Sequence, residues 1–142
     1  MLKDVPRTAL VLGLAGLVPF WGLPILALVD PAWGTQALTA QRLYAACILS
    51  FLGAVHWGWA LAEGQTGWTQ LGWSVVPSLV GWLALLSPSG GWLLLLAGLG
   101  VAWFVDDRSV KAGQFPAWYG RLRVILTAGA VAGLGIGMAG AA

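Results

Sequence analysis

Long apolar runs, separated by short polar breaks, take up most of this chain. The runs cover residues 8–29, 43–62, 68–86, 92–105 and 124–141. A helix needs about 20 apolar residues to cross the roughly 30 Å hydrocarbon core of a bilayer, and four of the runs approach or exceed that length. The fourth run is only about 21 Å long at 1.5 Å per residue. We expect it to include the flanking glycines from residue 90 onward, or to lie where the bilayer is thin.

The pattern therefore predicts an all-α fold, an integral membrane bundle of five transmembrane helices in a single domain. Composition supports it, because 59% of the 142 residues are apolar and only 8% are charged, against about 25% charged in soluble domains. No segment remains for a soluble domain. Cys47 is the single cysteine, which excludes a disulfide within the chain.

Basic residues are distributed unequally between the two ends of such a bundle. Five spans place six of them on the side of the N-terminus and Arg42 alone on the other side. Because basic loops stay in the cytoplasm, this bias predicts a cytoplasmic N-terminus and an external C-terminus. The first span is too long for the core of a signal peptide, and only seven residues precede it, too few for a transit peptide. We therefore expect a multi-pass protein of a bacterial inner membrane. The six residues are Lys3, Arg7, Arg108, Lys111, Arg121 and Arg123.

Glycine recurs at every fourth position in the last span. Gly129, Gly133 and Gly137 share one helix face, where another backbone can approach closely. The pattern predicts a helix-packing face. Whether it packs inside this chain or against another protein stays open at this point.

Prolines interrupt two of the spans. Pro19 and Pro24 remove backbone donors from the first span and predict a kink there. In the third span Ser74 and Ser78 flank Pro77, so their hydroxyl groups can bond to the backbone carbonyls of the kinked helix.

The stretch SFLGAVHWGWAL holds the only histidine, His56. Helical periodicity places Leu49, Gly53, Ala60 and Glu63 on the same face. We expect Gly53 to leave room beside the imidazole ring. A neutral histidine in lipid needs a hydrogen-bond donor and an acceptor nearby.

Two interpretations of His56 compete. In the first, a serine of the next helix, Ser74 or Ser78, bonds to the ring and ties the two helices together. In the second, His56 is a polar contact for a small molecule or the axial ligand of a tetrapyrrole. Zinc is not expected, because one histidine, one cysteine and scattered acids do not supply three or four ligands. Cys47 lies about two and a half turns from His56 on the same helix, too far for thiol activation, so we expect no catalytic residue.

The most polar segment, FVDDRSVKAGQFPAWYGRLRVIL, links the last two spans. Aromatic and basic side chains in such a loop are typical of an anchor at the lipid headgroups, with acids pairing with arginines across the hairpin. A docking surface for a partner is the alternative. The candidate residues are Asp107, Arg108, Trp118, Tyr119, Arg121 and Arg123.

Four segments of the chain resemble a known family. They are LGLAGLVPF at 12–20, ILSFLGAVHWG at 48–58, SVVPSLVGW at 74–82, and the Asp-Arg pair followed by PAWYGRLRVILT within 107–127. In this order they are similar to the small membrane proteins grouped as domain of unknown function 3429, which include the mitochondrial transmembrane protein 69. The resemblance implies a small helical membrane protein and lends no catalytic residue. The absence of a targeting extension, unlike the mitochondrial member, favours a bacterial origin. The family motifs contain His56, Ser74, Pro77, Asp107, Arg108, Trp118, Tyr119 and Arg123.

These observations predict a non-enzymatic accessory or assembly subunit that packs against a larger bioenergetic complex, respiratory or photosynthetic. The alternative is a small-molecule or tetrapyrrole binder or carrier that uses His56. Membrane lipids and other integral membrane proteins are the expected partners. No cofactor, metal or nucleic acid is expected.

Overall fold

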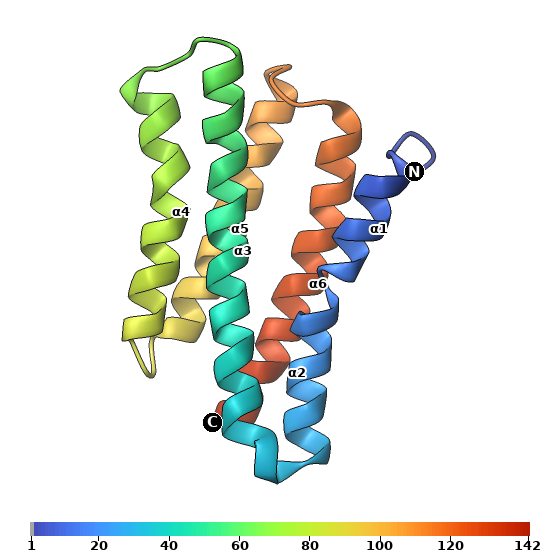
Figure 1. Cartoon of the computed structure of the whole chain (residues 1–142), viewed down its shortest axis with the longest axis vertical. Coiled ribbons are helices and arrows are strands. Elements are labelled where there is room, and N and C mark those ends of the chain that lie inside the picture. Colours follow the sequence, from blue (N-terminus) through green and yellow to red (C-terminus); the bar gives the residue numbers. More distant parts are fainter. Residues whose placement is uncertain (1) are drawn as a thin grey trace.

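The structure is a computed structural model that describes residues 2–142. It is an all-helical bundle of five rods, the first of which is broken into two helices (Figure 1). The N- and C-termini lie at opposite ends of the bundle. The elements are α1 (Arg7–Ala15), α2 (Val18–Val29), the short 3-10 helix η1 (Pro31–Trp33), α3 (Gly34–Ala62), α4 (Trp68–Leu86), α5 (Gly91–Lys111) and α6 (Ala117–Ala141).

The helical bundle is as expected, but three helix boundaries are wrong. α3 begins at Gly34 rather than residue 43, α5 continues to Lys111 rather than 105, and α6 begins at Ala117 rather than 124. Hydropathy placed the ends of the spans at the first polar residues, whereas the helices continue through them. Within residues 2–142, four helical stretches are long and apolar enough to cross a membrane, and α5 is not one of them. Its last turns carry Asp106, Asp107, Arg108 and Lys111.

The expected kink in the first rod is a break between α1 and α2. Pro19 stands at the start of α2 and cannot donate to the carbonyl group of Ala15. Beside the break, the hydroxyl group of Tyr44 donates to the carbonyl oxygen of Gly16 at 2.9 Å. From this point α1 leans away from α3 and packs against α6 (Figure 1).

Helix α3 is the central element, because it packs against α2, α4, α5 and α6. Its buried residues recur three or four positions apart, which is the spacing of one helix face. Leu49, on this face, is fully buried together with Leu95, Leu99 and Leu134 of the neighbouring helices.

A buried glutamine of α3 replaces a backbone hydrogen bond that a proline removes from α2. Pro24 has no N–H group, so the carbonyl oxygen of Phe20, four residues earlier, loses its helical donor. The Nε2 group of Gln41, which is 0% exposed, donates to that oxygen and to the carbonyl oxygen of Gly133, both at 2.8 Å. One side chain therefore joins α2, α3 and α6 where lipid offers no alternative donor.

An arginine of α3 caps the end of α4. Pro88 follows α4 and has no N–H group to offer its last carbonyl groups, and the carbonyl oxygen of Ala84 accepts only a long backbone hydrogen bond, from Ser87 at 3.4 Å. The Nη2 group of Arg42 donates to Ala84 at 2.6 Å and to the carbonyl oxygen of Ser87 at 2.7 Å. Its guanidinium group also lies over the ring of Trp92, 5.7 Å from the centroid. Arg42 thus closes the C-terminal end of α4 and binds it to α3.

The glycine ladder of α6 faces the inside of the bundle. A Cβ atom on Gly133 would lie 2.5 Å from the carbonyl oxygen of Phe20, and one on Gly129 would lie 2.8 Å from a methyl group of Leu17. A Cβ atom on Gly137 would overlap the Oε1 atom of Gln41. The ladder therefore packs against α2 and α3 of the same chain.

Gly133→Ala is expected to lower the free energy of unfolding by about 1–3 kcal/mol, because the methyl group would force α2 and α6 apart. Gly135→Ala is the matched control, since nothing lies within 4 Å of a Cβ atom there. It should be neutral or slightly stabilising, because alanine is the better helix former. Reversible unfolding in detergent micelles measures both. Equal effects of the two variants would show that the ladder faces lipid.

Candidate functional site

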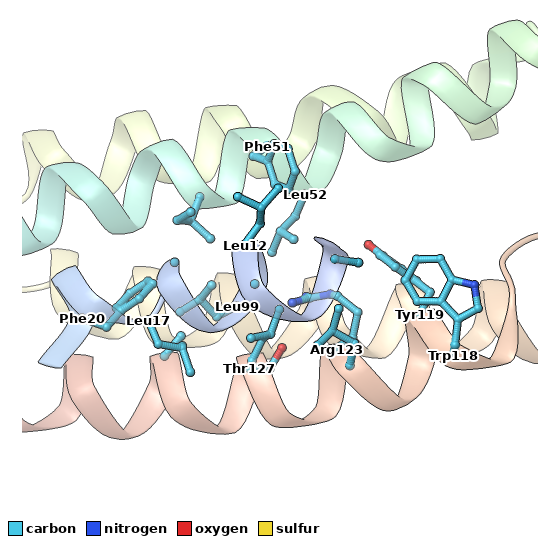
Figure 2. Close-up of a pocket in the computed structure, with 17 residues that line it drawn as sticks. Leu12, Leu17, Phe20, Phe51, Leu52, Leu99, Trp118, Tyr119, Arg123 and Thr127 are labelled. Atoms are coloured by element: carbon cyan, nitrogen blue, oxygen red, sulfur yellow. The ribbon is translucent and has the colours of Figure 1, made fainter. Parts of the chain in front are cut away.

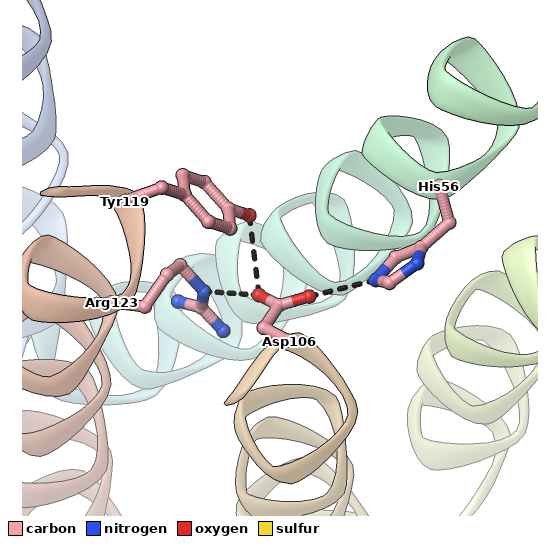
Figure 3. Close-up of polar contacts among 4 residues, drawn as sticks. All are labelled: His56, Asp106, Tyr119 and Arg123. Carbon is pink, nitrogen blue, oxygen red and sulfur yellow. Dashed lines mark hydrogen bonds and ion pairs between the residues drawn. The ribbon is translucent and has the colours of Figure 1, made fainter. Parts of the chain in front are cut away.

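A buried carboxylate at the end of α5 joins three helices. Asp106 is 1% exposed, and its Oδ1 atom lies 2.7 Å from the Nε2 atom of His56 on α3. Its Oδ2 atom accepts hydrogen bonds from Nε of Arg123 at 2.5 Å and from the hydroxyl group of Tyr119 at 3.2 Å, both on α6. Figure 3 shows the four side chains converging. We refer to His56, Asp106, Tyr119 and Arg123 as the Asp106 cluster.

The cluster lies inside the bundle, away from the ends of its helices. His56 is six residues before the end of α3, Asp106 five before the end of α5, and Arg123 six after the start of α6. At 1.5 Å per residue these positions lie roughly 8–9 Å from the helix ends. The three helices therefore bring their polar side chains to a common depth.

Charge fixes the protonation of the cluster. Arginine keeps its charge in proteins, and Arg123 is 5% exposed, so its buried positive charge requires the ionised form of Asp106. An ionised carboxylate only accepts hydrogen bonds, so Nε2 of His56 must carry the proton that it shares with Oδ1. Hydrogen bonds to ionised groups are about twice as strong as neutral ones. The cluster is neutral overall when His56 is neutral.

The loop between α5 and α6 covers the cluster. Phe115 is buried, and its ring centroid lies 5.0 Å from that of His56 and 5.3 Å from that of Tyr119. The carbonyl oxygen of Ser109 holds the loop by accepting from the backbone N–H groups of Gln114 at 2.9 Å and Phe115 at 3.4 Å. The phenyl ring thus shields the ionic contacts from water, which strengthens them.

The expected serine partner of His56 needs correction. The imidazole bonds to Asp106, while the hydroxyl group of Ser74 donates to the carbonyl oxygen of Leu71 on its own helix at 2.5 Å. The space left by Gly53 also has a different occupant, because a Cβ atom there would overlap the carbonyl oxygen of Ser74. Gly53 therefore allows the backbones of α3 and α4 to approach, rather than making room for the ring. Ser78 is half-buried on α4.

The six loop residues expected to anchor or dock do not form one surface. Tyr119 and Arg123 point inward to Asp106, so the expected pairing of an acid with an arginine across the hairpin occurs inside the bundle. Arg123 is buried and Tyr119 is half-buried, so neither lies on an exposed surface of the loop. The other four lie toward the end of the bundle: Arg121 pairs with Asp4 at 3.1 Å, Asp107 with Lys111 at 2.6 Å, Arg108 lies over Phe104, and Trp118 packs against Tyr119.

Sequence reasoning missed Asp106 as a site residue, although a signal was present. Leu95, Leu99, Ala102 and Asp106 follow one another at helical spacing, and all four are buried. Had the fourth span been extended past residue 105, this stripe would have pointed Asp106, and not Asp107, into the bundle. An ionisable side chain on such a face marks a site of interest by default.

The fold and the cluster together define a small multi-pass helical membrane protein with a buried, ion-paired core site. Comparison with known sequences agrees, because the family model described as Protein of unknown function (DUF3429) matches residues 5–139. The chain belongs to this family, which confirms the resemblance noted in its motifs.

Two relatives are named Transmembrane protein 69. The chain is 43% identical over 136 residues to the protein of Xenopus tropicalis, covering 92% of this chain and 53% of that relative. It is 31% identical over 132 residues to the protein of Mus musculus, covering 89% of this chain and 53% of that relative. The chain thus spans about half the length of these relatives. No solved structure matches it.

Asp106→Asn is expected to destabilise the protein by about 3–5 kcal/mol, because it leaves the charge of Arg123 buried without a counterion. Asp107→Asn is the matched control. The contact of Asp107 with Lys111 lies at the surface, where ion pairs contribute about 1 kcal/mol or less. Thermal unfolding in detergent compares the two variants. Similar losses would show that the Asp106 carboxylate is not a buried counterion.

A double variant separates charge from packing. Asp106→Leu with Arg123→Met removes both charges and keeps apolar bulk, so it should be more stable than Asp106→Asn alone. The same unfolding assay applies. A double variant as unstable as the single one would contradict the ion-pair explanation.

Proposed function

We propose that this protein is a non-enzymatic accessory or assembly subunit of a larger bioenergetic membrane complex, and that it attaches through the outer side of α3. The observation that carries the proposal is a contrast between the outward faces of the bundle. A stripe of exposed small side chains runs along α3 beside the exposed Phe51 and Trp57, whereas the outward faces of α4 and α5 carry mainly large apolar side chains.

The outer side of α3 carries a stripe of small residues. Cys47, Ser50, Ala54 and Gly58 are all exposed and lie three or four positions apart. Nothing lies within 4 Å of a Cβ atom on Gly58. In lipid, helices associate by close backbone packing and interhelical hydrogen bonds, for which small residues and serine are suited. The stripe fits a transmembrane helix of another membrane protein.

The outer faces of α4 and α5 have a different character. Leu79, Trp82 and Leu83 on α4 are each about half exposed, as are Val101 and Phe104 on α5. Side chains of this size suit contact with acyl chains and keep another backbone at a distance. The stripe of small side chains on α3 therefore supports this helix as the side for a protein partner.

The use of the polar side chains supports a non-enzymatic role. His56 faces inward and bonds to Asp106, while Cys47 is exposed on the opposite, outer side of the same helix. An imidazole that activates a thiol must lie within hydrogen-bond reach of it. Gln41 and Arg42 are likewise engaged with backbone carbonyls of α2, α4 and α6.

Charge supports a cytoplasmic N-terminus in a bacterial inner membrane. Arg42 and Arg123 are bonded inside the protein. The remaining five basic residues all belong to the N-terminal segment or to the α5–α6 hairpin, at the same end of the bundle (Figure 1). Among the basic residues that are not bonded inside the protein, all five lie at one end, so the charge bias is stronger than the six-to-one count in the sequence.

Tetrapyrrole binding through His56 is the alternative. Ligation through Nε2 would break the bond to Asp106, so we expect an absorption spectrum of the purified protein without a Soret or chlorin band. A band that is lost in His56→Ala would support the alternative and contradict the proposed function.

Site-specific crosslinking tests the subunit proposal. Cys47 is a unique handle on the stripe, and a photoactivatable benzophenone maleimide attached to it should crosslink one discrete protein in native membranes. The matched control moves the handle to the outer face of α4, as Cys47→Ser with Leu79→Cys, and should yield lipid adducts only. Adduct mass distinguishes a different protein from a second copy of this chain. Lipid adducts alone at both positions, or a second copy at Cys47, would contradict the proposal.

A further inference from the structure

We propose that a cavity between the first rod, α3 and α6 binds a lipophilic molecule whose head presents a neutral carbonyl oxygen. The cavity has a volume of about 340 Å³, within the range of small-molecule sites. Buried Leu52 and Leu99 form its floor, and exposed Leu12 and Phe51 lie at its mouth (Figure 2). The site is separate from the α3 stripe and independent of the proposed subunit role.

The broken first rod creates this cavity. Because the chain bends between α1 and α2, α1 leans away from α3 (Figure 1), and the cavity is lined by residues of both helices. Gly13 and Gly16, which have no side chains to fill it, are part of the lining. The exposed mouth residues belong to helices that face lipid, so a lipophilic molecule can enter from the bilayer.

Two buried donors in the wall of the cavity have no partner. The Nη2 atom of Arg123 and the hydroxyl group of Thr127 have no hydrogen-bond partner among residues 2–142, and both residues line the cavity. Arg123 is 5% and Thr127 is 8% exposed. Neither donor atom is itself open to the cavity, but the two side chains stand one turn apart on α6, so small rotations would bring both to one ligand oxygen. Figure 2 shows the guanidinium group of Arg123 reaching into the cavity beside Thr127.

Leaving these groups unpaired is costly in lipid. A buried donor without an acceptor destabilises the protein, and a charged donor does so more strongly. A threonine inside a helix commonly bonds to the carbonyl group one turn earlier, yet Thr127 does not. An oxygen acceptor supplied by a ligand satisfies both groups.

The charge balance of Arg123 and Asp106 favours a ligand whose head group is neutral. The positive charge of Arg123 is already balanced by Asp106 through the 2.5 Å contact to its Nε atom. A carboxylate or phosphate head would leave one net negative charge buried in this low-dielectric site. A ketone, quinone or ester carbonyl accepts hydrogen bonds without adding charge.

The shape of the cavity suits an apolar tail. Its lining on α6 runs from Trp118 to Ala130, which is roughly 18 Å along the helix. Arg123 and Thr127 lie within this length, and Leu17 and Phe20, at the start of α2, line the end toward Ala130. A carbonyl head at Arg123 can therefore extend an apolar tail toward α2.

Native mass spectrometry of the full chain in dodecyl maltoside tests the site with defined probes. Decyl-substituted benzoquinone and dioleoyl phosphatidylcholine represent the quinone and ester sources of a neutral carbonyl, and oleate represents an anionic head. One of the two neutral probes should form a saturable one-to-one adduct. Its affinity should fall about tenfold in Thr127→Val, because one hydrogen bond is lost. Leu12→Trp, which narrows the mouth, should weaken binding at least as much.

Matched controls make this result specific. Thr8→Val and Val11→Trp make the same changes on exposed positions of α1 that do not line the cavity, and they should bind like the unmodified chain. Variant-sensitive binding of the quinone alone or of the phospholipid alone identifies the source. Absence of saturable neutral adducts, equal affinities in all variants, or variant-sensitive binding of oleate alone would overturn the proposal.

Discussion

The buried carboxylate of Asp106 is the contact on which the arrangement of three helices depends. In a bundle surrounded by lipid, association gains little from the hydrophobic effect, because acyl chains are as apolar as leucine. Helix positions are therefore set by close backbone packing and by buried polar contacts. Asp106 binds both His56 of α3 and Arg123 of α6. If Asp106 moved, both side chains would lose this hydrogen-bond partner. It thus holds α3, α5 and α6 in one register.

The same constraint explains the polar residues at the other end of α3. Proline bends and ends the helices of this chain, and each such proline deprives a carbonyl group of its donor where water is absent. Gln41 supplies the missing donor for α2, Arg42 caps the last carbonyl groups of α4, and Tyr44 donates to the carbonyl group beside the break in the first rod. α3 is therefore anchored by polar contacts at both ends and by apolar packing between them. Because α3 is held at both ends, α1 can lean outward without disturbing the bundle. The cavity beside Arg123 lies where α1 leans outward.

Much of the fold was predictable from the sequence because hydropathy and proline reflect local chemistry. The bounds of α4 and the break near Pro19 follow from these signals alone. The start of α3, the end of α5 and the start of α6 do not, because Gln41, Asp106 and Arg123 are polar residues whose partners lie on other helices. The partner of His56 was misjudged for the same reason. Sequence periodicity identified the buried face of α3, but which acid lies opposite it depends on how α5 packs across the bundle.

The nitrogen-15 NMR spectrum of the imidazole ring tests the role of Asp106 most directly, since His56 is the only histidine and gives one pair of ring signals. We predict a proton on Nε2 that is donated in a strong hydrogen bond and protected from exchange with water. Asp106→Asn should shift this signal and abolish the protection. A ring protonated only on Nδ1, or a signal that exchanges rapidly and is unchanged by Asp106→Asn, would contradict the account.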